Sequence, residues 1–82
     1  MKVEVYGPGC ANCRRLEQQT REALANIGCA AEVTKVEDVA AMADAGVMRT
    51  PALAIDGRIV LQGRVPGVTE LEYIIRKAAA VS

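Results

Sequence analysis

The sequence of 82 residues contains no histidine, tryptophan or phenylalanine, and its aromatic side chains are two tyrosines. So few rings leave little surface on which nucleobases could stack, which argues against a nucleic-acid partner. Ten Lys and Arg residues balance ten Asp and Glu residues, so no net charge steers the chain toward a polyanion. No apolar run approaches the length of a membrane span. We therefore expect neither nucleic-acid nor membrane binding.

Apolar residues make up 51% of the chain, so a core can form from Val, Ile, Leu, Ala and Met. The length predicts one domain over residues 1–82. Met1 and Lys2 lead directly into a strand-like stretch instead of an apolar signal sequence. We expect a monomer in a reducing cytoplasm, where a close pair of cysteines is more often catalytic, redox-sensing or metal-binding than a structural disulfide.

Hydrophobic periodicity and turn residues predict four strands and three helices. Strands are expected at about residues 2–6, 31–36, 52–55 and 58–62, and helices from near Cys10 to Gly28, from an Asp38 N-cap through Ala45, and after Thr69. Asp56-Gly57 is a strong hairpin signal, and Thr69 with Glu72 fits a capping box. The order β-α-β-α-β-β-α predicts an α/β fold with a four-stranded mixed sheet and helices on both faces.

Cys10-Ala-Asn-Cys13 stands where the first strand gives way to the first helix. Unpaired N–H groups and the helix dipole at this end favour a negatively charged sulfur. The spacing of three residues puts Cys13 on the apolar stripe behind Cys10. Thiol–disulfide exchange needs an exposed thiolate and a second thiol within reach. We therefore expect Cys10 to be the attacking nucleophile and Cys13 the resolving thiol.

Metal binding is the alternative use of such a pair. A structural zinc site needs four ligands, and the chain offers no histidine and one further cysteine, Cys29. Two thiolates suffice for Cu(I), so a soft-metal chaperone or sensor built on Cys10 and Cys13 stays open. We expect Cys29 to lie at the far end of the first helix, as a small packed thiol.

The whole chain resembles the thioredoxin superfamily, and most of all its small archaeal and bacterial redox-active disulfide proteins. The resemblance rests on Tyr6-Gly-Pro-Gly-Cys-Ala-Asn-Cys13 after a strand and on Thr50-Pro51 before a hairpin. It implies a thioredoxin-like fold with a cis bond before Pro51, packed against the dithiol, and a Thr50 backbone that pairs with substrate. The implied activity is thiol–disulfide oxidoreduction of protein disulfides, with a flavin-dependent thioredoxin reductase as donor and no bound cofactor.

Some residues depart from the family pattern. Ala-Asn between the cysteines is the dipeptide of neither ordinary thioredoxins nor glutaredoxins, and the glutathione-binding segment of glutaredoxins is not matched. The resemblance makes Glu4 a candidate proton relay to the resolving thiol, although Lys2, Glu4 and Tyr6 could equally form a partly open sheet face. Arg14 and Arg15 either favour the Cys10 thiolate or are simply solvated.

Overall fold

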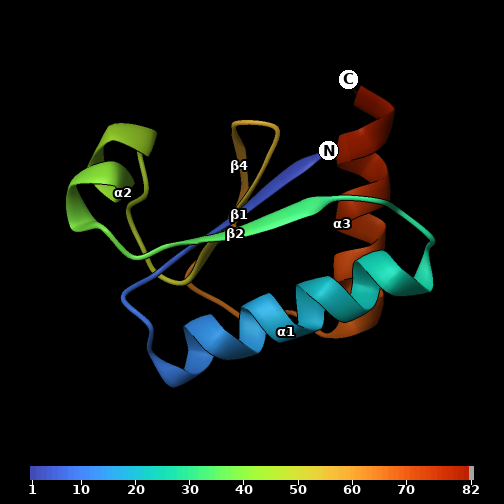
Figure 1. Ribbon diagram of the computed structural model, residues 1–82, viewed down its shortest axis with the longest axis horizontal. Coiled ribbons are helices and arrows are strands. Elements are labelled where there is room, and N and C mark those ends of the chain that lie inside the picture. The colour runs from blue at the N-terminus through green and yellow to red at the C-terminus, as the bar shows by residue number, and fades with distance from the viewer. Residues whose placement is uncertain (82) are drawn as a thin grey trace.

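The computed structural model describes residues 1–81 (Figure 1). Seven elements follow one another close to their predicted bounds: β1 (Lys2–Tyr6), α1 (Ala11–Asn26), β2 (Glu32–Val36), α2 (Val39–Ala45), β3 (Ala52–Ile55), β4 (Arg58–Gln62) and α3 (Val68–Val81). Within the described part of the chain, no helix is both long and apolar enough to cross a membrane.

The four strands form one mixed sheet in the order β2-β1-β3-β4. β1 runs parallel to β2, to which α1 connects it, and antiparallel to β3. β3 and β4 are antiparallel neighbours joined by the predicted hairpin. The central position of β1 matters for the site, because the chain leaves β1 at Tyr6 and turns through Gly7–Gly9 directly into α1 (Figure 1).

Helices cover both faces of the sheet, as predicted. On one face, α1 and α3 contact each other and close the main core, whose fully buried side chains include Val3, Leu16, Leu53, Leu71 and Ile75. On the other face, α2 contributes Met42 to a smaller cluster with Tyr6, Ala52 and Ala54. β1 serves both cores because successive side chains of a strand point to opposite faces.

The β3–β4 hairpin contains an irregularity that the sequence does not reveal. Asp56 and Gly57 both have positive φ, 50° and 83°, as a two-residue type I′ turn requires. Ile55 pairs with Arg58 next to the turn, but the register shifts between Leu53 and Ala54. An extra residue in β4 is the mark of a β-bulge. Beyond it, Gln62 lies opposite Ala52.

The predicted capping box of the last helix is wrong. α3 begins at Val68, one residue before the expected Thr69 cap, and the Leu71 N–H donates to the Gly67 carbonyl at 3.0 Å. Glu72 is engaged elsewhere, since its carboxylate accepts a hydrogen bond from the Asn26 side chain at 3.0 Å. This contact between α3 and the end of α1 is tertiary, so local sequence could not indicate it.

Candidate active site

Cys10 is the N-cap of α1. Its backbone is extended (φ −70°, ψ 169°), its carbonyl accepts the first helical hydrogen bond from the Arg14 N–H at 3.0 Å, and its Sγ accepts one from the Cys13 N–H at 3.3 Å. A sulfur therefore occupies the place where Ser or Asp usually satisfies a free N–H at a helix start. An ionised sulfur accepts such a bond better than a neutral thiol does.

The two thiols differ in burial, as the helical spacing predicts. Cys10 is exposed, whereas Cys13 is 5% exposed and lies one turn along α1. Cys10, Cys13 and Cys29 are all free thiols in the structure. A partner can therefore reach the sulfur of Cys10, while Cys13 is shielded behind it.

The pKa values of the two thiols shift in opposite directions, and for different physical reasons. Hydrogen bonds from the Cys13 side chain and then from the Cys13 backbone N–H lower the pKa of Cys10. Burial, reinforced by the hydrogen bond that Cys13 gives to Cys10, raises the pKa of Cys13. The thiolate therefore forms first on the exposed sulfur, which is the arrangement that a nucleophile with a resolving partner requires.

These pKa directions predict the pH dependence of alkylation. The rate at which Cys10 reacts with iodoacetamide should rise as pH increases and level off above its pKa. The midpoint should lie below that of the same cysteine in the urea-unfolded chain, whereas Cys13 should react more slowly and at higher pH. Mass spectrometry of peptides from a pH series follows each site. A Cys10 midpoint at or above the unfolded value would contradict the hydrogen-bonding account.

Pro51 lies close to Cys13, with Gly7 between them. The Thr50–Pro51 peptide bond is cis, as the resemblance implies, and Pro51 is buried while Thr50 is exposed. Gly7 stands between proline and sulfur: a Cβ built on Gly7 would be 4.0 Å from the Pro51 Cα and would overlap the Cys13 Sγ. The structure thus brings Cys10, Cys13 and the Thr50–Pro51 segment together at one end of the two central strands, where the end of β1 pairs with the start of β3.

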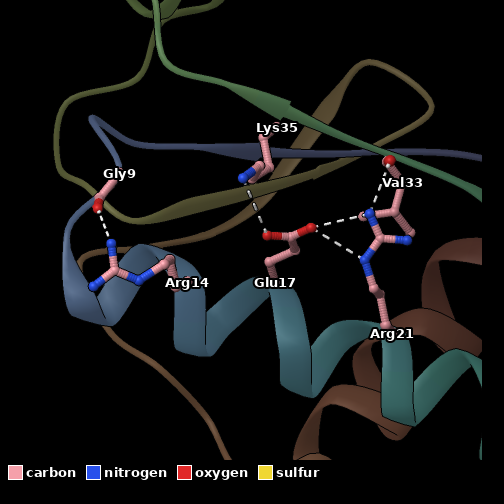
Figure 2. Close-up of polar contacts among 6 residues, drawn as sticks. All are labelled: Gly9, Arg14, Glu17, Arg21, Val33 and Lys35. Carbon is pink, nitrogen blue, oxygen red and sulfur yellow. Dashed lines mark hydrogen bonds and ion pairs between the residues drawn. The ribbon is translucent and has the colours of Figure 1, made fainter.

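A pocket of about 90 Å³ opens beside Cys13 and is lined by residues of β1, α1 and β2. Three charged side chains line it, Arg14, Lys35 and Glu37. Figure 2 shows Arg14 donating to the Gly9 carbonyl at 2.8 Å and Lys35 reaching toward Glu17 of α1, with Nζ and Oε1 3.9 Å apart. Sequence reasoning considered Arg14 but missed the other two. No local pattern indicates Lys35, because its place at the pocket follows from its pairing with Val5 in the register of β2 with β1.

Glu4 lies apart from the dithiol and from the charged residues of the pocket. Its neighbours Val3 and Val5 pack in the α1/α3 core, so Glu4 points to the opposite face, where it pairs with Ala54 of the α2 cluster. There burial and the adjacent Glu4 carboxylate raise the pKa of the Tyr6 hydroxyl. Glu4 and Cys13 are thus on opposite faces of the sheet, which removes the geometric basis for a proton relay between them.

Cys29 lies well away from the dithiol. It follows α1, whose 16 residues span about 24 Å. Cys29 is partly buried against the main core, with its Sγ 3.9 Å from the Met1 Sδ. Among residues 1–81, no three His, Cys, Asp or Glu side chains lie close enough together to hold a metal ion. Cys29 is a packed thiol outside the site.

Known proteins are similar to this chain in sequence. Residues 1–76 match the family model described as a thioredoxin domain. A protein named thioredoxin from Methanothermobacter thermautotrophicus is 40% identical over 75 residues, covering 92% of this chain and 97% of its own. A thioredoxin from Methanocaldococcus jannaschii is 34% identical over 70 residues, covering 85% and 80%.

A solved structure gives the same architecture. Thioredoxin 1 from the thermophilic eubacterium Thermosipho africanus TCF52B superposes with a TM-score of 0.64, covering 99% of this chain and 97% of its own, at 20% sequence identity. At that identity the likeness establishes the fold alone.

The dithiol at the start of α1, together with the thioredoxin names of the family model and of both relatives, defines a thioredoxin-like thiol–disulfide oxidoreductase. Because the family model covers residues 1–76 and both relatives are thioredoxins, the chain belongs to the thioredoxin family.

Proposed function

We propose that this protein reduces disulfides in other proteins through Cys10 and Cys13. The Cys10 thiolate attacks one sulfur of a substrate disulfide, so that a Cys10–substrate disulfide forms and the other substrate sulfur leaves as a thiolate. Cys13 then gives up its proton and attacks the Cys10 sulfur, which releases the second substrate thiolate and closes the Cys10–Cys13 disulfide. Two electrons pass from the enzyme to the substrate, and the two substrate thiolates take up the proton released by Cys13 and one proton from the solvent.

The observation that carries the proposal is the asymmetry of the pair. Cys10 is exposed and its sulfur accepts a hydrogen bond from the Cys13 N–H at the helix start, while Cys13 is 5% exposed one turn further along the helix. Thr50 and Pro51 lie beside this pair and are proposed to receive the substrate backbone. Arg14, whose guanidinium donates to the Gly9 carbonyl, supports the turn that carries Cys10 into α1.

The chain acts as a monomer and as a single domain of residues 1–82, in a reducing cytoplasm. A flavin-dependent thioredoxin reductase returns two electrons to the Cys10–Cys13 disulfide after each cycle. No resident cofactor takes part, because the two sulfurs hold the electron pair between the half-reactions.

Equilibration in defined thiol–disulfide buffers tests the activity. The Cys29→Ser variant leaves one possible intramolecular disulfide, and quenching followed by mass spectrometry reads the oxidised fraction. We expect full, reversible conversion to the Cys10–Cys13 disulfide, followed by NADPH-dependent reduction with a thioredoxin reductase. Absence of a reversible disulfide, or tight retention of one Cu(I) or Zn(II) ion by the two thiols, would overturn the proposal in favour of a soft-metal protein.

A further inference from the structure

The segment that connects α2 to Pro51 has its backbone N–H groups almost fully paired. The Val47 N–H donates to the Met42 carbonyl at 2.9 Å, which completes the end of α2. The next two N–H groups, of Met48 and Arg49, both donate to the side-chain oxygen of Gln62, at 2.7 and 3.1 Å. One amide side chain of β4 therefore holds two consecutive residues of the neighbouring segment.

Thr50 differs from its neighbours in this hydrogen bonding. Proline has no N–H, so among the donors from Val47 to Pro51 the Thr50 N–H alone has no hydrogen-bond partner within residues 1–81. Thr50 is exposed. The carbonyl of Pro51 is already used, since it accepts from the Gly63 N–H at 2.8 Å. A free backbone donor thus stands next to the dithiol, on a segment whose flanking groups are fixed.

Further contacts with the end of β4 hold the segment in place. Gln62 is half-buried and lies opposite Ala52 beyond the β-bulge. The Arg49 side chain covers Gly63, where a Cβ would come 2.9 Å from the Arg49 Cδ. Met48, in contrast, is 85% exposed. The backbone is therefore held while the Met48 side chain projects into solvent, where a partner can reach it.

We propose that Gln62 is a positioning residue that gives the site its preference for disulfides within extended polypeptide over small disulfides. By holding the Met48 and Arg49 N–H groups, Gln62 presents the free Thr50 N–H to a carbonyl of an incoming chain, as in strand addition to an exposed edge. A small disulfide has no peptide carbonyl to accept the Thr50 N–H, so it reacts with the Cys10 sulfur without this hydrogen bond. The inference rests on the proposed oxidoreductase function.

Two substitutions at one position test this role. Gln62→Leu removes the acceptor, whereas Gln62→Glu is the matched control because it keeps an acceptor oxygen at the same reach. Each variant is assayed for kcat and KM with insulin, a protein disulfide, and with cystamine, a small one. For Gln62→Leu we expect kcat/KM on insulin to fall about tenfold, mainly through KM, as loss of one or two hydrogen bonds implies. Its rate with cystamine should stay within about twofold of wild type, since the dithiol is untouched.

The possible outcomes separate the two proposals. Equal loss on both substrates would mean that Gln62 merely supports the fold, and no loss on either would mean that the segment needs no such support. Either result overturns the inference, as does a Gln62→Glu variant that is as impaired on insulin as Gln62→Leu. Failure of the wild-type protein to reduce both cystamine and insulin would instead overturn the oxidoreductase function itself.

Discussion

A Cys13→Ser variant is expected to stop halfway through the reaction and to accumulate as a disulfide-linked adduct with its substrate. Cys10 remains exposed at the N-cap of α1 and still accepts the bond from the backbone N–H of residue 13, so the first attack proceeds. Release then depends on thiols from solution. An intramolecular group acts at a very high effective concentration, so losing it should slow release by on the order of 100-fold or more.

Non-reducing electrophoresis with a disulfide-bonded substrate measures the adduct, and a coupled assay measures the turnover. Cys10→Ser is expected to give neither adduct nor turnover, and Cys29→Ser should behave as wild type because Cys29 packs against the main core, outside the dithiol site. Adduct formation by Cys10→Ser through Cys13 would reverse the assigned roles. Unchanged turnover of Cys13→Ser would show that Cys10 works alone.

The hydrogen bond that Cys13 gives to Cys10 makes this variant informative about pKa as well. The Cys13 side chain is the largest cause of the lowered pKa of Cys10. A serine hydroxyl at the same place can donate a hydrogen bond too, so the alkylation midpoint of Cys10 should change less in Cys13→Ser than in Cys13→Ala. Under the proposed function, the resolving residue should therefore have two separable effects: it lowers the pKa of the nucleophile before attack and releases the product afterwards.

Sequence patterns were sufficient to predict most of the scaffold. The alternation in β1, the stripe on α1 and the Asp56-Gly57 turn are local signals, and each produced the predicted element. The same locality explains why Cys10 is exposed and Cys13 is buried, because a spacing of three residues at a helix start places the second cysteine on the side facing the core. Features determined by a few consecutive residues could be predicted without knowledge of the tertiary structure.

Features that depend on register could not be predicted in this way. A regular two-residue hairpin would place Leu61 opposite Ala52, but the shift between Leu53 and Ala54 places Gln62 there instead. A shift of one residue also reverses the face to which each side chain points. For this reason Gln62 drew no attention from sequence alone, and Glu4, chosen by its distance from Cys10 along the chain, proved to lie on the wrong face of the sheet.

Gly7→Ala is expected to disturb the positions of the Cys10 and Cys13 sulfurs more than any other glycine-to-alanine substitution in the chain. Gly7 is buried, and its N–H donates to the Val36 carbonyl at 3.0 Å. A Cβ at this position would overlap the Cys13 Sγ and lie 3.0 Å from the Cys13 Cβ, well inside the ~3.5 Å at which carbon atoms pack comfortably. Cys13 must then rotate away or the first turn of α1 must shift. Overpacking of this kind costs about 1–3 kcal/mol of stability.

Displacement of Cys13 has a chemical consequence beyond the lost stability. The hydrogen bonds that lower the pKa of Cys10 come from Cys13, so the alkylation midpoint of Cys10 should move to higher pH, and closure of the Cys10–Cys13 disulfide should slow. Turnover should fall about tenfold or more, since a misplacement of about 1 Å is enough for losses of that order. Gly67→Ala is the matched control, because a Cβ at Gly67 meets nothing within 4 Å. If Gly7→Ala kept both the turnover and the alkylation profile of the wild type, close packing of Gly7 against Cys13 could not be what keeps the Cys13 sulfur in place next to the Cys10 sulfur.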